Sequence, residues 1–320
     1  MKVFPYLSEI IACFMFSSVP VILKSIDISF LYKIVISILS VFIPAFSVFL
    51  YYKKKKNIDL KFSSLLTNNR KIQIGLLFSI YYYCLYYGFI IIPVSIAIPI
   101  FMLSPIMMAL LDNIIYGTIL NNGQIGSFII TFIGVLLVVV SKTKINNENI
   151  YFGSLLIFIS AAIYAYVYTQ IKHTIPEDIE KYQFDTINFE MLETLTIPLI
   201  VSVFILIVFN LVNINYSHII PKKLQPILPN FKDMILMVSV LFILSYVGNL
   251  MYLYSYNNLP LTTYGALENM EVIASLVIGY YFLSEDITKQ KIIGCLTIIS
   301  GILLELYFRQ QNVKQIKSDS

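Results

Sequence analysis

The chain has 320 residues, of which 58% are hydrophobic and only 12% are charged, and its mean hydropathy is +0.81. A soluble domain carries about 25% charged residues, so this composition excludes a soluble globular protein and indicates a membrane protein. The net charge is +4, with lysines concentrated at Lys53–Lys56. We interpret this run as a topology signal and expect no nucleic-acid partner.

Ten apolar runs of about 20 residues follow one another along the chain, and none alternates as a barrel strand would. A chain inside the bilayer must satisfy its own backbone hydrogen bonds, so the runs predict an all-α integral membrane protein with ten transmembrane helices. The predicted helices cover residues 6–24, 30–52, 71–92, 94–116, 124–141, 150–171, 187–209, 233–257, 261–284 and 289–308.

The distribution of Lys and Arg predicts the orientation. With the N-terminus inside, the connection 53–70 and both termini are cytoplasmic, and that side carries more than half of the 22 Lys and Arg residues. The connection 210–232 then lies on the opposite side. The chain is rich in Ile, Asn, Lys and Tyr, which is consistent with an AT-rich genome and favours a bacterial inner (plasma) membrane, with an organelle membrane as the alternative.

An internal repeat emerges when the chain is shifted against itself by 167 residues, which places Pro93 on Pro260 and Gly134 on Gly301. The chain is thus predicted to contain two five-helix repeats, 1–145 and 146–320. Because five is odd, the second repeat enters the membrane with the opposite orientation. Inverted repeats of this kind are common in secondary transporters and place a binding site between the halves.

Two segments carry a family resemblance: LSPIMMALLDNIIYGTILNNGQIGSFIITFIG in the first half and LENMEVIASLVIGYYFLSEDITKQKIIGCLTIISG in the second. They resemble the drug/metabolite transporter superfamily, specifically its EamA-like ten-helix members. Glu285, Gly294 and Gly301 match the family pattern, whereas Thr118 and Ser127 depart from it. The resemblance implies that helices 1–4 and 6–9 enclose a cavity, with helices 5 and 10 outside. It does not choose among the amino acids, nucleotide sugars, sugar phosphates, S-adenosylmethionine and cationic drugs that the superfamily carries.

Two carboxylates, Glu268 and Glu271, interrupt the ninth apolar run. A charged side chain at a helix centre costs about 2.5–3.5 kcal/mol on insertion scales, so a lipid-facing pair is disfavoured. The two residues are three apart and share a helical face, which Tyr264 and Ser275 extend. We therefore expect this face to point into the protein.

Polar stripes on other helices match this face. Helix 8 aligns Ser245, Asn249, Tyr252 and Tyr256, and helices 3 and 6 each carry a stripe of Ser and Tyr. Tyrosine stripes also occur in dry packing and interfacial belts, but beside two carboxylates we interpret them as a cavity lining. The candidate substrate-binding residues are Glu268, Glu271, Tyr264, Ser275, Asn249, Tyr252, Tyr82, Tyr86, Tyr164, Tyr168 and Glu9.

The remaining acids have local explanations. Glu9 either reaches interfacial water or faces the cavity, and Asp112 lies near the exit of its helix. Glu190 and Glu193 begin helix 7, where they would complement the helix dipole. Glu285 precedes helix 10 and is expected to cap its N-terminus rather than to bind solute.

The residues that commonly hold metals are scattered. Cys13, Cys84 and Cys295 lie inside predicted spans as small core residues, and His173 and His218 fall in polar connections. We expect no metal site and no cofactor.

The sign of the buried charge indicates the solute. Lys24 and Lys33 lie at span ends, where they can reach the interface, and no other Lys or Arg lies deep in a predicted span, whereas phosphorylated substrates need fixed cations. A carboxylate pair among tyrosines suits an amine or a sulfonium, and two acids one turn apart also suit proton coupling or exchange. The sequence thus predicts a secondary-active, alternating-access transporter of a small amine-containing or cationic metabolite such as an amino acid or S-adenosylmethionine.

Two alternatives remain at this point. An intramembrane enzyme would need a catalytic His, Ser–His or Cys–His arrangement, which the sequence does not suggest. A lipid-handling or structural membrane subunit could keep its glutamates protonated and hydrogen-bonded between helices.

Overall fold

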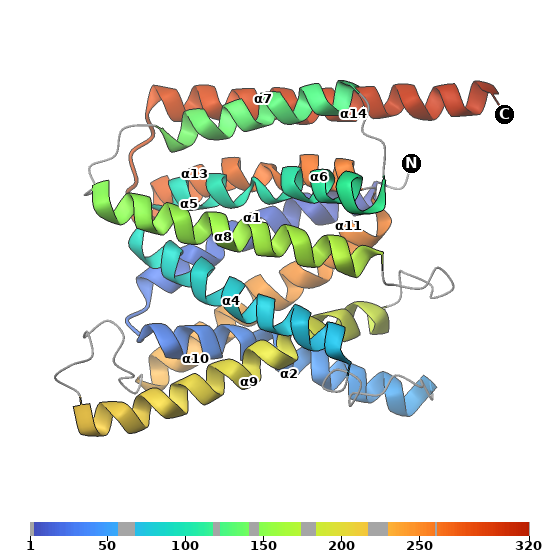
Figure 1. The fold of residues 1–320 in the computed structure, drawn as a ribbon. Coiled ribbons are helices and arrows are strands. Elements are labelled where there is room, and N and C mark those ends of the chain that lie inside the picture. The colour runs from blue at the N-terminus through green and yellow to red at the C-terminus, as the bar shows by residue number, and fades with distance from the viewer. Residues whose placement is uncertain are drawn as a thin grey trace.

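The computed structural model describes residues 3–56, 68–117, 122–140, 147–173, 184–216, 230–259 and 261–319, and these are helical apart from short turns (Figure 1). In chain order the elements are α1 (Phe4–Ser25), α2 (Phe30–Lys56), α4 (Asn69–Ile91), α5 (Val94–Phe101), α6 (Ser104–Tyr116), α7 (Asn122–Val139), α8 (Asn147–Lys172), α9 (Phe184–Tyr216), α10 (Phe231–Leu241), the π-helical stretch η2 (Phe242–Val247), α11 (Gly248–Asn258), α12 (Leu261–Glu268), α13 (Met270–Leu283) and α14 (Lys289–Asp319).

These elements form the ten predicted spans of an integral, multi-pass membrane protein. Within the described part of the chain, seven helices are long and apolar enough to cross a bilayer, and Ile125–Val139 and Met270–Leu283 are shorter apolar helices. The fourth, eighth and ninth spans are not the single regular helices that the sequence predicts. The fourth breaks between α5 and α6, the ninth breaks between α12 and α13, and the eighth contains η2.

The two breaks occur at equivalent positions of the repeats. Met102 follows α5 and Asn269 follows α12, and the shift of 167 residues that relates the repeats places one on the other. Pro105 accounts for the first break, because it lacks the N–H that would continue the helix. The two corresponding helices also end alike, since Gly117 and Ser284 both adopt left-handed backbone conformations. This correspondence supports the inverted-repeat architecture.

Helices α7 and α14 pack along each other as a layer outside the other helices (Figure 1). Their backbones touch at small residues: a Cβ added at Gly134 would lie 2.8 Å from the Gly294 carbonyl oxygen, and one at Gly301 would lie 3.0 Å from the Ser127 carbonyl oxygen. Small residues permit this approach in membranes, where apolar burial does not drive helix association. Gly294 and Gly301, which match the family pattern in the sequence, therefore allow these two helices to pack closely.

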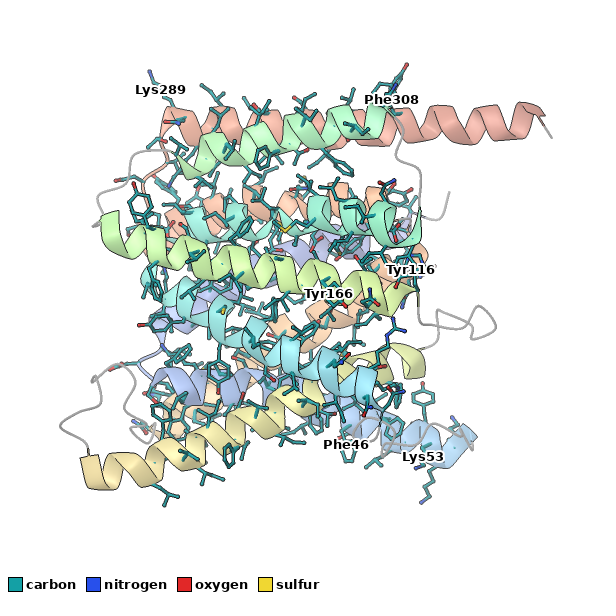
Figure 2. All side chains as sticks on the ribbon, in the orientation of Figure 1. Phe46, Lys53, Tyr116, Tyr166, Lys289 and Phe308 are labelled. Carbon is teal, nitrogen blue, oxygen red and sulfur yellow. The ribbon has the colours of Figure 1, made fainter. Side chains whose placement is uncertain are left out.

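The bundle has two ends, named here for one residue at each. One end carries both termini, with Lys53, Tyr116 and Phe308 towards it, and we call it the Lys53 side. Lys289 lies at the opposite end, which we call the Glu285 side (Figures 1 and 2). Between the ends, large apolar side chains such as those of Ile80, Phe204 and Leu296 are exposed on the outer surface. In a multi-pass membrane protein such surface faces lipid.

We predict that Gly134→Ala destabilises the protein, whereas Gly126→Ala does not. The added methyl at Gly134 would collide with backbone atoms of α14, but a Cβ at Gly126 has no atom within 4 Å. Overpacking of this kind costs about 1–3 kcal/mol. Thermal unfolding in detergent should give a lower midpoint for Gly134→Ala alone, and equal midpoints for the two variants would contradict the close helix contact.

Candidate functional site

A cavity of about 110 Å³ lies between the two repeats. This volume is several times the roughly 10–15 Å³ that one water needs. Its walls come from both repeats, and neither α7 nor α14 contributes to them. The lining residues are Phe16, Val19, Ser37, Val41, Phe78, Tyr81, Tyr82, Leu85, Tyr86, Phe89, Phe101, Tyr164, Tyr168, Ser245, Asn249, Tyr252, Glu268 and Glu271.

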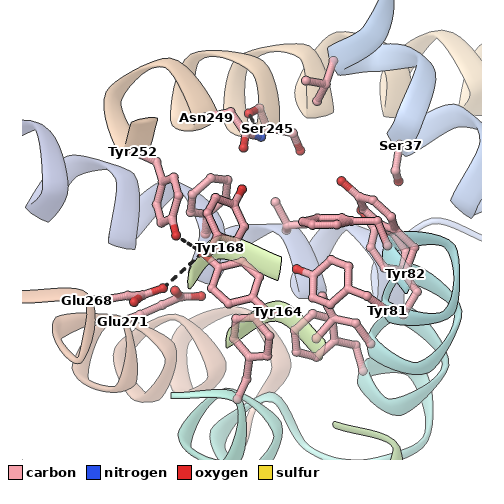
Figure 3. Close-up of a pocket in the computed structure, with 18 residues that line it drawn as sticks. Ser37, Tyr81, Tyr82, Tyr164, Tyr168, Ser245, Asn249, Tyr252, Glu268 and Glu271 are labelled. Carbon is pink, nitrogen blue, oxygen red and sulfur yellow. Dashed lines mark hydrogen bonds between the residues drawn. The ribbon is translucent and has the colours of Figure 1, made fainter. Parts of the chain in front are cut away.

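The two carboxylates lie at the helix break of the ninth span. Glu268 ends α12 and Glu271 lies in the first turn of α13, and their side chains come together on one wall of the cavity (Figure 3). They are 3% and 7% exposed. The free N–H groups and the dipole at the start of α13 favour negative charge at Glu271. The break therefore places an acid beside the positive end of a half-helix.

Helix α1 supports this break. The Ser17 hydroxyl donates to the Glu271 carbonyl oxygen at 3.1 Å, and the Cys13 thiol lies 3.7 Å from the carbonyl oxygens of both Leu267 and Glu268. Carbonyl groups freed by a helix break need such partners inside a membrane protein. Cys13 is thus a buried core residue, as predicted, and it also contacts the backbone of the break.

Tyr164 connects the carboxylate wall to the rest of the cavity. Its hydroxyl hydrogen-bonds the Tyr252 hydroxyl and lies 3.4 Å from Glu268 Oε1 (Figure 3). Its ring centre lies 4.4 Å from that of Tyr168 and 5.2 Å from that of Phe101. The aromatic residues thereby form one continuous cluster beside the carboxylates.

The structure brings most of the predicted site residues together. Eight of them line the cavity, namely Glu268, Glu271, Asn249, Tyr252, Tyr82, Tyr86, Tyr164 and Tyr168. Tyr264, Ser275 and Glu9 do not. The prediction assumed one regular helix through residues 261–284, and the break at Asn269 ends that shared face.

The three outlying residues have other surroundings. The Tyr264 ring packs edge-on against Tyr252 at 5.2 Å, and the Ser275 hydroxyl donates to the Val272 carbonyl oxygen of its own helix. Glu9 was expected either to reach interfacial water or to face the cavity, but it is 0% exposed and is not among the lining residues. It lies behind the carboxylate wall, near enough to Glu268 and Glu271 to repel them electrostatically.

Several lining residues escaped sequence reasoning. Ser37 and Phe101 are uncharged and do not belong to a polar stripe in the sequence. The helical period places Tyr82 and Tyr86 on one face of α4 and Tyr81 on another, so Tyr81 is not among the predicted residues. The cavity wraps around α4, so adjacent tyrosines both reach it (Figure 3). The dense cluster YYYCLYY at residues 81–87 was the available signal.

Other polar residues serve contacts outside the cavity. Helix α9 begins at Phe184, so Glu190 and Glu193 do not lie in its first turn as predicted. Glu193 pairs with Lys71 at 3.4 Å, and the Glu190 side chain lies outside the described part. Asp112 hydrogen-bonds His173 at the Lys53 side. Lys33 does not reach the interface as expected: it is 7% exposed and donates to the Leu23 carbonyl oxygen at 2.5 Å.

The cavity lining is acidic. Among the lining residues that the structure describes there is no Lys or Arg. The searched residues also contain no group of three His, Cys, Asp or Glu side chains arranged to hold a metal ion. The fixed charge that a solute meets is therefore that of Glu268 and Glu271.

A second, smaller cavity extends from the first towards the Lys53 side. The two share Phe78, Tyr82, Tyr168 and Asn249 in their linings. The second adds residues near the end of α8, in the first half of α9 and in the middle of α11, namely Ile171, Met191, Thr194, Leu195 and Leu253. Hollow space thus continues from the carboxylates towards one membrane side.

Comparison with known proteins identifies the family. A profile of the EamA-like transporter family matches residues 4–140 and again residues 151–307. The chain belongs to the EamA-like transporter family. It is therefore a membrane transporter of the drug/metabolite transporter superfamily and not an enzyme.

A solved crystal structure of another protein shares this fold. It aligns with a TM-score of 0.64 over 97% of this chain and 99% of its own, at 13% sequence identity. The likeness therefore concerns the fold alone. A search among curated proteins finds no match.

We predict that Tyr164→Phe lowers stability more than Tyr166→Phe. The first change leaves buried polar groups of Tyr252 and Glu268 without their hydroxyl partner, which costs about 1–3 kcal/mol. Tyr166 lies on the same helix but is 42% exposed on the outer surface (Figure 2), so its change is the matched control. Thermal midpoints of the two variants in detergent make the comparison, and an unaffected Tyr164→Phe would argue against the hydroxyl contacts.

Proposed function

We propose that this transporter carries a small amine-containing or cationic metabolite, of the amino acid or sulfonium class, by alternating access. The observation that carries the proposal is the position of Glu268 and Glu271, two buried carboxylates on the wall of an aromatic cavity between the repeats. Buried ionisable residues in membrane proteins typically mark a solute or ion pathway.

The aromatic wall suits a cation. The rings of Tyr81, Tyr164, Tyr168 and Tyr252 line the space next to the carboxylates. An aromatic face attracts a desolvated cation by about 2 kcal/mol, in addition to its attraction to a carboxylate. An anionic solute would meet two acids and no compensating Lys or Arg in the described lining. Phosphorylated solutes therefore fit poorly.

The helix breaks support alternating access between the repeats, which we take as residues 1–145 and 146–320. Equivalent discontinuous helices at the membrane midplane are a recurring feature of transporters built from inverted repeats. Two acids within one turn of each other resist simultaneous ionisation, so a proton can replace the solute cation between them. Exchange of solute for protons follows naturally from this arrangement.

We also propose the orientation. The lysine run at the end of α2 supports a cytoplasmic position for the Lys53 side, and with it for both termini, in a bacterial inner membrane. The Glu285 side then faces outward. In this orientation the second cavity extends towards the cytoplasm.

A panel of solutes tests the charge preference. We expect amines and sulfonium compounds to raise the thermal midpoint of the purified protein, because a ligand that binds only the folded state stabilises it. Nucleotide sugars and sugar phosphates should leave the midpoint unchanged. Saturable uptake of a phosphorylated solute into proteoliposomes would overturn the proposal.

Glu→Gln substitutions test the carboxylates directly. Glu268→Gln and Glu271→Gln keep the shape and most hydrogen bonds but remove the ionisable group, so initial uptake of the stabilising solute should fall at least about tenfold. We expect Glu271→Gln to be at least as severe as Glu268→Gln. Glu193→Gln is the matched control, since Glu193 pairs with Lys71 and does not line the cavity.

Uptake is measured in proteoliposomes across a range of pH and corrected for monodisperse protein. Normal rates and an unchanged pH profile in both cavity variants would show that the glutamates are structural, because a protonated Glu and a Gln make equivalent hydrogen bonds.

A further inference from the structure

Glu285 binds the start of a helix in the other repeat. Its two carboxylate oxygens accept hydrogen bonds from the backbone N–H groups of Val94 at 2.8 Å and Ser95 at 3.0 Å. These are N–H groups at the start of α5 that lack partners within the helix, and the helix dipole favours a negative charge there. Glu285 therefore caps a helix as predicted, but that helix is α5 and not α14. At the start of α14 the Lys291 N–H instead donates to the Thr288 hydroxyl oxygen at 3.2 Å.

Two lysines complete the contact. Lys291 donates to the Ser95 hydroxyl at 2.8 Å and to the Asp286 carbonyl oxygen at 2.8 Å. Lys24, at the end of α1, donates to the Ile92 carbonyl oxygen at 2.7 Å. Both lysines are attracted electrostatically by Glu285. We call this set, Glu285, Lys291 and Lys24 on the backbone of residues 92–95, the Glu285 latch.

The backbone holds the Glu285 side chain in place. Ser284 adopts a left-handed conformation with φ of 54°, which turns the chain back so that the Glu285 N–H donates to the Gly279 carbonyl oxygen at 3.1 Å. A Cβ at Gly279 would lie 3.1 Å from Glu285 Oε2, so the absence of a side chain there leaves room for the carboxylate. A non-glycine residue in this conformation is strained and indicates a position fixed by its surroundings.

The latch joins the two repeats at one end of the bundle. Helix α5 begins at the latch with Val94 and ends at Phe101, which lines the cavity. Ser95 and Lys291 are 1% and 2% exposed, whereas Glu285 and Lys24 are half-buried, so part of the latch is packed and its carboxylate borders the surface. The hollow space continues towards the Lys53 side, as the second cavity shows. The latch therefore joins the repeats at the end of the bundle opposite the second cavity.

The first repeat lacks the charges that would make an equivalent latch. The shift of 167 residues places Glu285 on Thr118 and Lys291 on Gln124, both uncharged. Thr118 and the Gln124 side chain lie outside the described part, so this comparison concerns the sequence alone. The repeats thus differ in charge where they would otherwise be equivalent.

We propose that the Glu285 latch holds the transporter closed on the Glu285 side, and that this carboxylate must leave the start of α5 for that side to open. The inference rests on the proposed alternating access. It adds gating residues that neither line the cavity nor contact the solute. Charge-assisted hydrogen bonds are about twice as strong as neutral ones, so removing the charge should favour the open state.

Cysteine labelling tests the latch without any solute. In a variant lacking Cys13, Cys84 and Cys295, Ser37→Cys provides a thiol in the half of α2 nearer the Glu285 side, on the cavity wall. Adding Glu285→Gln should raise its labelling by a membrane-impermeant maleimide from the Glu285 side by about tenfold, the effect of losing one charge-assisted bond. Asp233→Asn removes a negative charge from the first turn of α10, outside the latch, and should leave the rate unchanged.

The outcomes separate the latch from the proposed function. Unchanged labelling in Glu285→Gln, or an equal rise in Asp233→Asn, would overturn the latch. If Glu285→Gln does not yield monodisperse protein, Lys291→Gln removes the contact to Ser95 and should shift labelling in the same direction. Because no solute is added, a failure to find amine transport would leave the labelling result standing.

Discussion

Two carboxylates must be kept inside a protein that is surrounded by lipid, and this constraint determines much of the architecture. Glu268 and Glu271 cannot face hydrocarbon, so the ninth span must turn them inward and the neighbouring spans must supply polar partners. Tyr164 of α8 donates to Glu268 and is itself hydrogen-bonded to Tyr252 of α11. Helix α1 supplies Cys13 to the carbonyl groups at the end of α12 and Ser17 to the Glu271 carbonyl group in the first turn of α13.

The two inverted repeats have the same helix break but different side chains beside it. Each half has a broken helix, and the residue that ends its first segment lines the cavity: Phe101 in one half and Glu268 in the other. Two symmetric half-sites would place acids on opposite walls. The observed arrangement instead sets aromatic side chains beside an acidic pair, as the proposed solute with a cationic group and an apolar remainder would require.

The sequence predicts the spans well because hydropathy reports directly on the absence of water around a transmembrane helix. It predicts the carboxylates for the same reason, since Glu268 and Glu271 are conspicuous in an apolar run. The errors share a physical origin. Sequence proximity predicts that Glu285 caps the helix that follows it, but its hydrogen-bond partners Val94 and Ser95 lie about 190 residues away in the chain.

The helix break was hidden for a related reason. Asn269 is compatible with a helix, and what stabilises the break is a set of donors on α1, which periodicity within one segment cannot report. Once the break is overlooked, Tyr264 and Ser275 are placed on the cavity face, and residues on other helices such as Ser37 and Tyr81 go unnoticed. Local patterns identify which residues are polar, whereas tertiary contacts decide where they point.

The two half-helices at the breaks also connect the cavity to the latch. Helix α13 begins beside Glu271 and ends at Leu283, immediately before the turn that carries Glu285. Its 14 residues span about 21 Å, at 1.5 Å per residue. Helix α5 makes the reverse connection, from Val94 at the latch to Phe101 at the cavity. Both elements have ends in each site and are packed against each other, so neither site can rearrange without moving a helix that belongs to the other. A cation that neutralises the carboxylates changes the charge at the start of α13, and the far end of that helix is where Glu285 is held. In the proposed mechanism, solute binding and gating are thereby joined through these two short helices.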